Sequence, residues 1–230
     1  MRLPILAILV SATLVASCAG PCSNGDTAIF SARFEQDIVG QAPSLTRQFG
    51  SPGASLTLDG KATVATSPLI ASRKGVMLER TTIPPETHLV ATASAPIVKG
   101  VAYVTWRGYA AETTKFPGEA LTLVVRSSAG DPVVTLKLVD RTWRVLDAAG
   151  VERLELIGSY DPTKDHRLLI QCFPLRKLFD ICIDGDELVK DMLYESMQAT
   201  DVQVVEASLP MMITALAEVT FVADLIRIAK

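Results

Sequence analysis

The chain has 230 residues, of which 49% are hydrophobic and 20% are charged, and its formal net charge is −3. A chain of this length can bury about two-thirds of its unfolded surface, so we expect one domain with one substantial core. The mildly acidic balance argues against a nucleic-acid partner, because nucleic-acid binders need clustered positive charge to neutralise phosphates.

The N-terminus has the pattern of an export signal. Arg2 precedes an apolar run at residues 3–16, which is shorter than the roughly 20 residues that a membrane-spanning helix needs. The following Val15-Ala16-Ser17-Cys18 resembles the lipobox of bacterial lipoproteins, in which the cysteine becomes the lipidated first residue. The alternative is an ordinary secretory signal cut near Ala19. We therefore predict a signal peptide at residues 1–17 and an exported protein of the bacterial cell envelope, anchored to a membrane only through a lipid on Cys18.

After a short polar tether at residues 18–26, the rest of the chain, residues 27–230, forms the expected domain. Short apolar or alternating runs separated by turn residues are typical of an all-β sandwich. Residues 120–157 have short loops and predict a four-stranded meander, whereas residues 187–200 predict a short helix or an irregular crossover. The expected strands are 27–34, 55–58, 62–66, 75–79, 88–93, 100–109, 120–126, 133–139, 142–146, 152–157, 167–173, 178–183, 202–206 and 219–228.

A hairpin at residues 165–185 is the clearest strand pair and carries two of the four cysteines. Two apolar runs are separated by Pro174-Leu175-Arg176-Lys177 and closed by Asp184-Gly185. If Cys172 and Cys182 oppose each other across the hairpin, they share a face and form a disulfide. A register shifted by one residue places them on opposite faces and leaves both as thiols. The length of the turn does not decide between the two registers.

Three segments carry a resemblance to a known fold family. They are Phe34-Glu35 with Asp37, Gly40 and Pro43, the run Phe179-Asp180-Ile181-Cys182-Ile183-Asp184-Gly185, and the terminal run at residues 219–226. Together they resemble the concanavalin A-like, laminin-G-like jelly rolls. The resemblance implies two curved antiparallel sheets, often with a concave face that binds sugar or peptide.

The sequence predicts no catalytic residue. Glycosidases of this superfamily carry Glu-x-Asp-x-x-Glu on one strand, because retaining hydrolysis needs two carboxyl groups about 5 Å apart. The nearest match, at residues 35–40, has Gly40 in place of the acid, and we interpret it as a strand end that runs into a loop. A scattered Ser-His-Asp set is not excluded by this search.

No metal or other cofactor is predicted either. The acidic group Asp184, Asp186 and Glu187 fits a hairpin turn better than a calcium site, because no further oxygen ligand is evident nearby. His88 and His166 have no Cys or His at zinc-ligand spacing.

Aromatic residues are the remaining candidates for ligand binding, because sugar rings stack on Trp and Tyr. Strand alternation places Tyr103, Arg107 and Tyr109 on one face, as a stripe that could bind a ligand, and Trp106 on the core face. Trp143 lies between two arginines, and either a ligand-binding or a core position is open to it. The competing interpretation for all of them is packing, because aromatics form only 6% of the chain.

These observations favour a non-catalytic, lectin-like envelope lipoprotein whose ligand is a glycan or an envelope protein. One alternative is a divergent glycoside hydrolase of the same fold, which would bring paired carboxylates into a cleft. The other is a structural envelope lipoprotein, which would present a broad apolar patch or open sheet edges.

Overall fold

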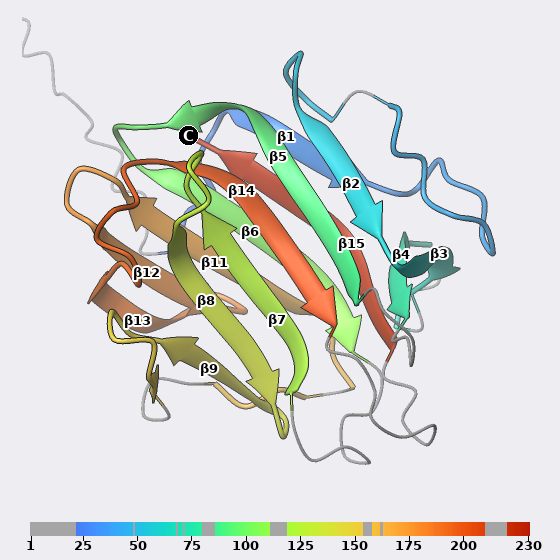
Figure 1. Ribbon diagram of the computed structural model, residues 1–230. Helices are drawn as coiled ribbons and strands as arrows, with labels where there is room; N and C mark the ends of the chain where they lie inside the picture. The colour runs from blue at the N-terminus through green and yellow to red at the C-terminus, as the bar shows by residue number, and fades with distance from the viewer. Residues whose placement is uncertain are drawn as a thin grey trace, which may run out of the picture.

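The computed structural model describes residues 22–47, 49–67, 69–70, 72–79, 86–110, 119–153, 158–161, 163–209 and 220–230. The predicted signal peptide and Cys18 lie outside these residues. The described chain forms fifteen strands in two antiparallel sheets that pack face to face (Figure 1). The predicted all-β sandwich is confirmed. No helix long and apolar enough to cross a bilayer occurs among the described residues.

The eight-stranded sheet joins the two ends of the domain, because β1 pairs with the last strand, β15. The order of its other strands is β13-β12-β11-β6-β15-β4-β3. Its members are β1 (Ala28–Arg33), β3 (Lys61–Thr66), β4 (Lys74–Glu79), β6 (Ala102–Ala110), β11 (His166–Phe173), β12 (Leu178–Ile183), β13 (Asp186–Leu193) and β15 (Thr220–Ala229).

The seven-stranded sheet has the order β10-β9-β8-β7-β14-β5-β2. The consecutive strands β7 to β10 are neighbours, as the predicted meander requires, although residues 154–157 of the last expected strand lie outside the described residues. Its members are β2 (Ser55–Asp59), β5 (Thr87–Ile97), β7 (Glu119–Arg126), β8 (Pro132–Val139), β9 (Thr142–Leu146), β10 (Glu152–Arg153) and β14 (Val202–Leu209).

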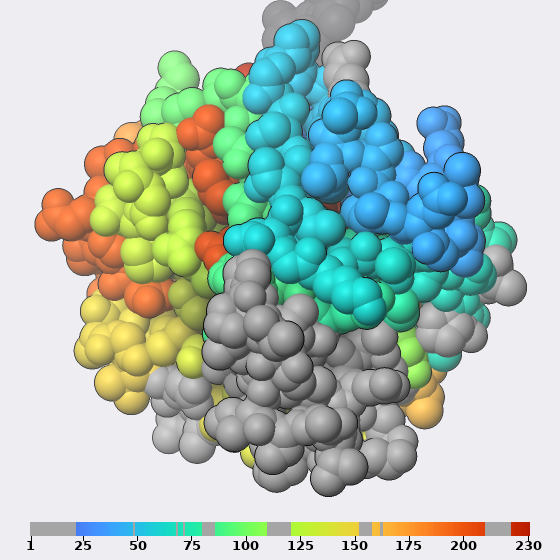
Figure 2. Space-filling model, turned by 45° about the vertical axis from the view of Figure 1, so that its right-hand side comes forward, coloured from blue at the N-terminus to red at the C-terminus, as the bar shows by residue number. Residues whose placement is uncertain are grey.

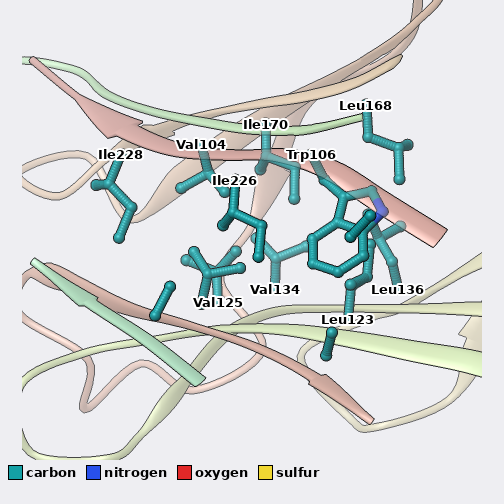
Figure 3. Packing of buried hydrophobic residues seen from close by; sticks show 14 of the residues in the cluster. Val104, Trp106, Leu123, Val125, Val134, Leu136, Leu168, Ile170, Ile226 and Ile228 are labelled. Carbon is teal, nitrogen blue, oxygen red and sulfur yellow. The ribbon is translucent and has the colours of Figure 1, made fainter. Parts of the chain in front are cut away.

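The core lies between the sheets and follows from strand alternation, because every second side chain points inward. Trp106 of β6 and Ile226 of β15 face Leu123 of β7 and Val134 of β8 across the interior (Figure 3). All four side chains are at most 3% exposed. The opposite positions of the same strands face outward, so each sheet presents one outer face on which a ligand site can form.

The prediction of a helix or crossover after residue 186 is wrong for its first half, because β13 is a strand paired with β12. Asp184 and Gly185 both have positive φ, at 55° and 99°, which is the geometry of a two-residue type I′ hairpin turn. Register shifts interrupt the β12–β13 pairing. Because of these irregularities, the sequence of β13 does not show the regular alternation of a strand. Leu188 and Met192 are four residues apart, which is also the spacing of neighbours on one face of a helix.

The Cys172–Cys182 disulfide, one of the two alternatives left open for the hairpin, does not form. The β11–β12 register pairs Cys172 with Phe179 and Cys182 with Leu169. Because Phe179 and Cys182 are three positions apart, the two cysteines lie on opposite faces of the sheet. Cys172 is a buried thiol in the core. Cys182 is not a thiol as in the second alternative, since it forms a disulfide with Cys22 of the tether, with the Cα atoms 5.9 Å apart.

Candidate functional site

The aromatic stripe predicted from the sequence lies on the outer face of the eight-stranded sheet. Tyr103, Arg107 and Tyr109 are half-buried there, and Trp106 points into the core as expected. Trp143 does not belong to a binding surface. It is 2% exposed and packs in the core edge-on to Tyr160, so it takes the core position, one of the two that the sequence left open. Arg144 points to the other side of β9, and Arg141 lies in the turn before the strand, so neither marks the environment of Trp143.

The tether covers one end of this stripe. Beyond the disulfide, Gln171 donates a hydrogen bond to the Ser23 carbonyl (3.2 Å), and Arg227 donates to the carbonyls of Asn24 (2.8 Å) and Gly25 (3.1 Å). Gly25 packs so closely on Tyr103 that an added Cβ would overlap the tyrosine ring. The Tyr103 ring is therefore in contact with the protein's own N-terminal segment.

Charged partners occupy the centre of the stripe. Arg107 Nε lies 2.7 Å from Asp224 Oδ1, and Arg73 lies 3.0 Å from Asp165 and 3.6 Å from Asp224. Burial and the neighbouring Asp224 raise the pKa of Asp165, against the lowering effect of the two arginines. Tyr103 and Arg107, two of the side chains that the sequence suggested for a ligand, are thus engaged within the protein.

A second polar group lies on the outer face of the seven-stranded sheet. His88 of β5, Arg126 of β7 and Glu206 of β14 come together there and are called the Glu206 cluster below. The inward neighbours Val205 and Ala207 are buried in the core, so alternation turns Glu206 outward. His88 Nδ1 lies 2.8 Å from one Glu206 oxygen, and Arg126 Nε donates to the other at 2.9 Å.

The electrostatics of the cluster favour an ionised glutamate. Burial raises the pKa of Glu206, but hydrogen bonds from His88 and Arg126 outweigh it and hold this pKa below its usual range. The His88 and Arg126 side chains are 32% and 33% exposed, so both also face solvent. A fixed carboxylate between two exposed donors can bind the hydroxyl groups of a polar ligand.

Sequence reasoning missed this cluster. It considered His88 only as a zinc ligand and did not single out Arg126 or Glu206. Glu206 is 118 residues from His88 and 80 from Arg126, and only the strand order β7-β14-β5 makes them neighbours. The available signal was a charged residue at an outward position within an apolar run, as in Val205-Glu206-Ala207.

Two hollows mark the surface elsewhere. One, of about 400 Å³, lies in the segment between β1 and β2, which stands beside β2 in Figure 2. Its lining includes Asp37 and Arg47, which form an ion pair, and the Arg47 guanidinium also lies over the rings of Phe34 and Phe49. Residues 35–40 form a loop there, as predicted. The other, of about 520 Å³, lies between the β9–β10 turn and β13.

The described residues contain no group of three or more His, Cys, Asp or Glu side chains placed to hold a metal ion. Asp184 of the predicted acidic turn instead accepts hydrogen bonds from His166 Nδ1 (2.7 Å) and the Arg167 amide (2.8 Å).

Two packed antiparallel sheets, with the first and last strands paired, define a β-sandwich of the concanavalin A-like kind. Among solved structures, the carbohydrate esterase vb_24B_21 from Shiga toxin-encoding bacteriophage phi24B is similar, with a TM-score of 0.61 and 16% identity over 89% of this chain and 98% of that one. Lectin I-B4 from Griffonia simplicifolia has a TM-score of 0.54 and 11% identity over 86% of this chain and 98% of the lectin.

A sialidase is similar as well, with a TM-score of 0.59 and 11% identity. The match covers 90% of this chain but 19% of the sialidase, so the chain corresponds to about a fifth of that enzyme. No protein-family model and no curated protein matches the chain. At these identities the likeness shows the fold alone.

Proposed function

We propose that this protein is an exported, lectin-like protein that binds a glycan on the outer face of its seven-stranded sheet. The observation that carries the proposal is the Glu206 cluster. Its carboxylate is held by two donors that remain about one-third exposed. Support also comes from the fold, which a lectin and a carbohydrate esterase share.

The arrangement suits sugar hydroxyls because each hydroxyl both donates and accepts a hydrogen bond. Glu206 can only accept when ionised, whereas Arg126 can only donate, so adjacent hydroxyls of one sugar find complementary partners. The positions of these groups are set before a ligand arrives, which reduces the entropy lost on binding. Outward Val90, which opposes Glu206 in the β14–β5 ladder and is partly exposed, supplies apolar surface for the carbon face of a sugar ring.

We also propose that the chain is lipidated at Cys18, on the basis of Val15-Ala16-Ser17-Cys18. The Cys22–Cys182 disulfide supports export, because disulfides persist in oxidising compartments. Since the disulfide holds Cys22 on the eight-stranded sheet, residues 19–21 alone would separate the lipid from the body, a reach of about 14 Å. The eight-stranded sheet would then lie near the membrane, and the Glu206 cluster would face away from it.

The test is a glycan-array screen of the full chain, followed by titration of each bound glycan. Arg126→Ala removes a charge-assisted donor worth about 1.5–3 kcal/mol, so affinity should fall about 10- to 100-fold. Tyr109→Ala, on the other sheet, is the matched control and should bind as the parent does.

Two results would contradict the proposal. If Tyr109→Ala loses glycan binding and Arg126→Ala keeps it, the site would lie on the predicted aromatic stripe instead. The absence of binding to every glycan would remove the lectin-like function altogether.

A further inference from the structure

A serine hydroxyl lies next to the Glu206 cluster. Ser208 follows Glu206 by two residues in β14, on the same outer face, and its direct partner in the β14–β5 ladder is His88. Directly opposed side chains of an antiparallel pair have Cβ atoms about 4.5–5.5 Å apart. Within the described part of the chain the half-buried Ser208 hydroxyl makes no hydrogen bond. It is therefore available to the imidazole beside it.

The imidazole is already oriented. Because Glu206 is ionised, the 2.8 Å contact places a proton on His88 Nδ1 and leaves Nε2 as the acceptor in the neutral ring. The Glu86 carboxylate lies 3.7 Å from Nε2, beyond hydrogen-bond distance. Arg126 holds the second Glu206 oxygen and so fixes the carboxylate that orients the ring.

We propose that Ser208, His88 and Glu206 form a nucleophile, a general base and a positioning residue that hydrolyse a carboxylic ester. The three groups have the roles of a serine hydrolase site, which is recognised by geometry and not by position in the sequence. This activity goes beyond glycan binding and does not depend on it. The substrate class is an O-acyl ester that can approach the outer face of the seven-stranded sheet.

The reaction balances without a cofactor. Ser208 Oγ attacks the ester carbonyl carbon while its proton moves to His88 Nε2. The tetrahedral intermediate collapses, the bond to the alcohol oxygen breaks, and the alcohol leaves with the proton from His88. Water then attacks the acyl-serine and gives a proton to His88. Release of the carboxylic acid returns that proton to Ser208.

Ser208 and His88 are direct partners in the β14–β5 ladder, and their side chains lie on the same outer face. A contact between a nucleophile and its base often tightens only when substrate binds, so the absence of a Ser208–His88 hydrogen bond in the free protein is compatible with the role. Glu206 would act only by orienting His88, because the direct ladder partner of Ser208 is His88 and not Glu206.

The experiment treats the purified full chain with a fluorophosphonate, which phosphonylates activated serines, and locates the adduct by intact mass and peptide mapping. One adduct on Ser208 is expected, and none in Ser208→Ala. Ser55→Ala is the matched control, since Ser55 is an exposed, outward serine of β2 in the same sheet. It should be labelled as the parent is.

Hydrolysis of p-nitrophenyl acetate gives the second measurement. Ser208→Ala and His88→Asn should each lower kcat/KM about 100-fold or more. Glu206→Gln should lower kcat with little change in KM, because Glu206 orients the base and does not hold the ester. Circular dichroism checks that each variant is folded.

The proposal is overturned if the parent protein takes up no label, or if Ser208→Ala is labelled or hydrolyses ester as the parent does. Glycan binding by a parent that takes up no label would overturn this proposal alone. Labelling of Ser208 without any glycan binding would overturn the lectin-like proposal alone.

Discussion

The Cys22–Cys182 disulfide closes a loop of 160 residues and is expected to contribute a large share of the stability. In the chain-entropy model, a cross-link over a loop of this length removes about 17 cal/mol/K from the unfolded chain, or about 5 kcal/mol at 25 °C. Cys22→Ser and Cys182→Ser should therefore each lower the free energy of unfolding by about 3–5 kcal/mol. The lower end allows for residual structure in the unfolded chain.

The assay is urea denaturation followed by the fluorescence of Trp106 and Trp143, both buried in the core. Either single variant breaks the same bond, so the double variant should be no more than about 0.5 kcal/mol less stable than the singles. Cys172→Ala is the control, because it leaves the disulfide intact and should cost about 1 kcal/mol. A loss below about 2 kcal/mol in the single variants, or additive losses in the double variant, would refute the reasoning.

Three further predictions follow from the packing and the charges. Trp143→Ala should lower the free energy of unfolding by about 3–5 kcal/mol without affecting glycan binding, because it empties a core position. Gly60→Ala should lower the free energy of unfolding by more than about 1 kcal/mol, and Gly130→Ala should lower it by less than Gly60→Ala does. Both glycines have positive φ, but of the two only Gly60 would bring an added Cβ against backbone, at 2.7 Å from Thr87 Cα. Because folding lowers the pKa of Glu206 below its ordinary 4.5, its stabilising effect is present above that pH and is lost as the pH falls through the folded pKa. The difference in unfolding free energy between the parent and Glu206→Gln should thus shrink as the pH falls below 4.5, and a constant difference would contradict this origin.

The position of most strands was readable from the sequence, because a half-buried strand alternates apolar and polar residues whatever its partner is. Alternation also placed Trp106 inward and Tyr103 outward, as observed. It failed at β13, where register shifts break the period of two. It also left open whether Trp143 lies in the core or in a binding surface. Neighbouring arginines indicate which side of a strand faces solvent, but not how deeply the opposite side is buried.

Which strands pair with each other was decided only by the tertiary structure. A period of two tells which face a side chain takes, but not which strand lies beside it or in which register. The pairing of Cys22 with Cys182 and the meeting of His88 with Glu206 depend on a strand order set by burial across the whole chain. The sequence by itself therefore determined the sandwich and the orientation of most side chains, and only the packing of distant strands determined the candidate site.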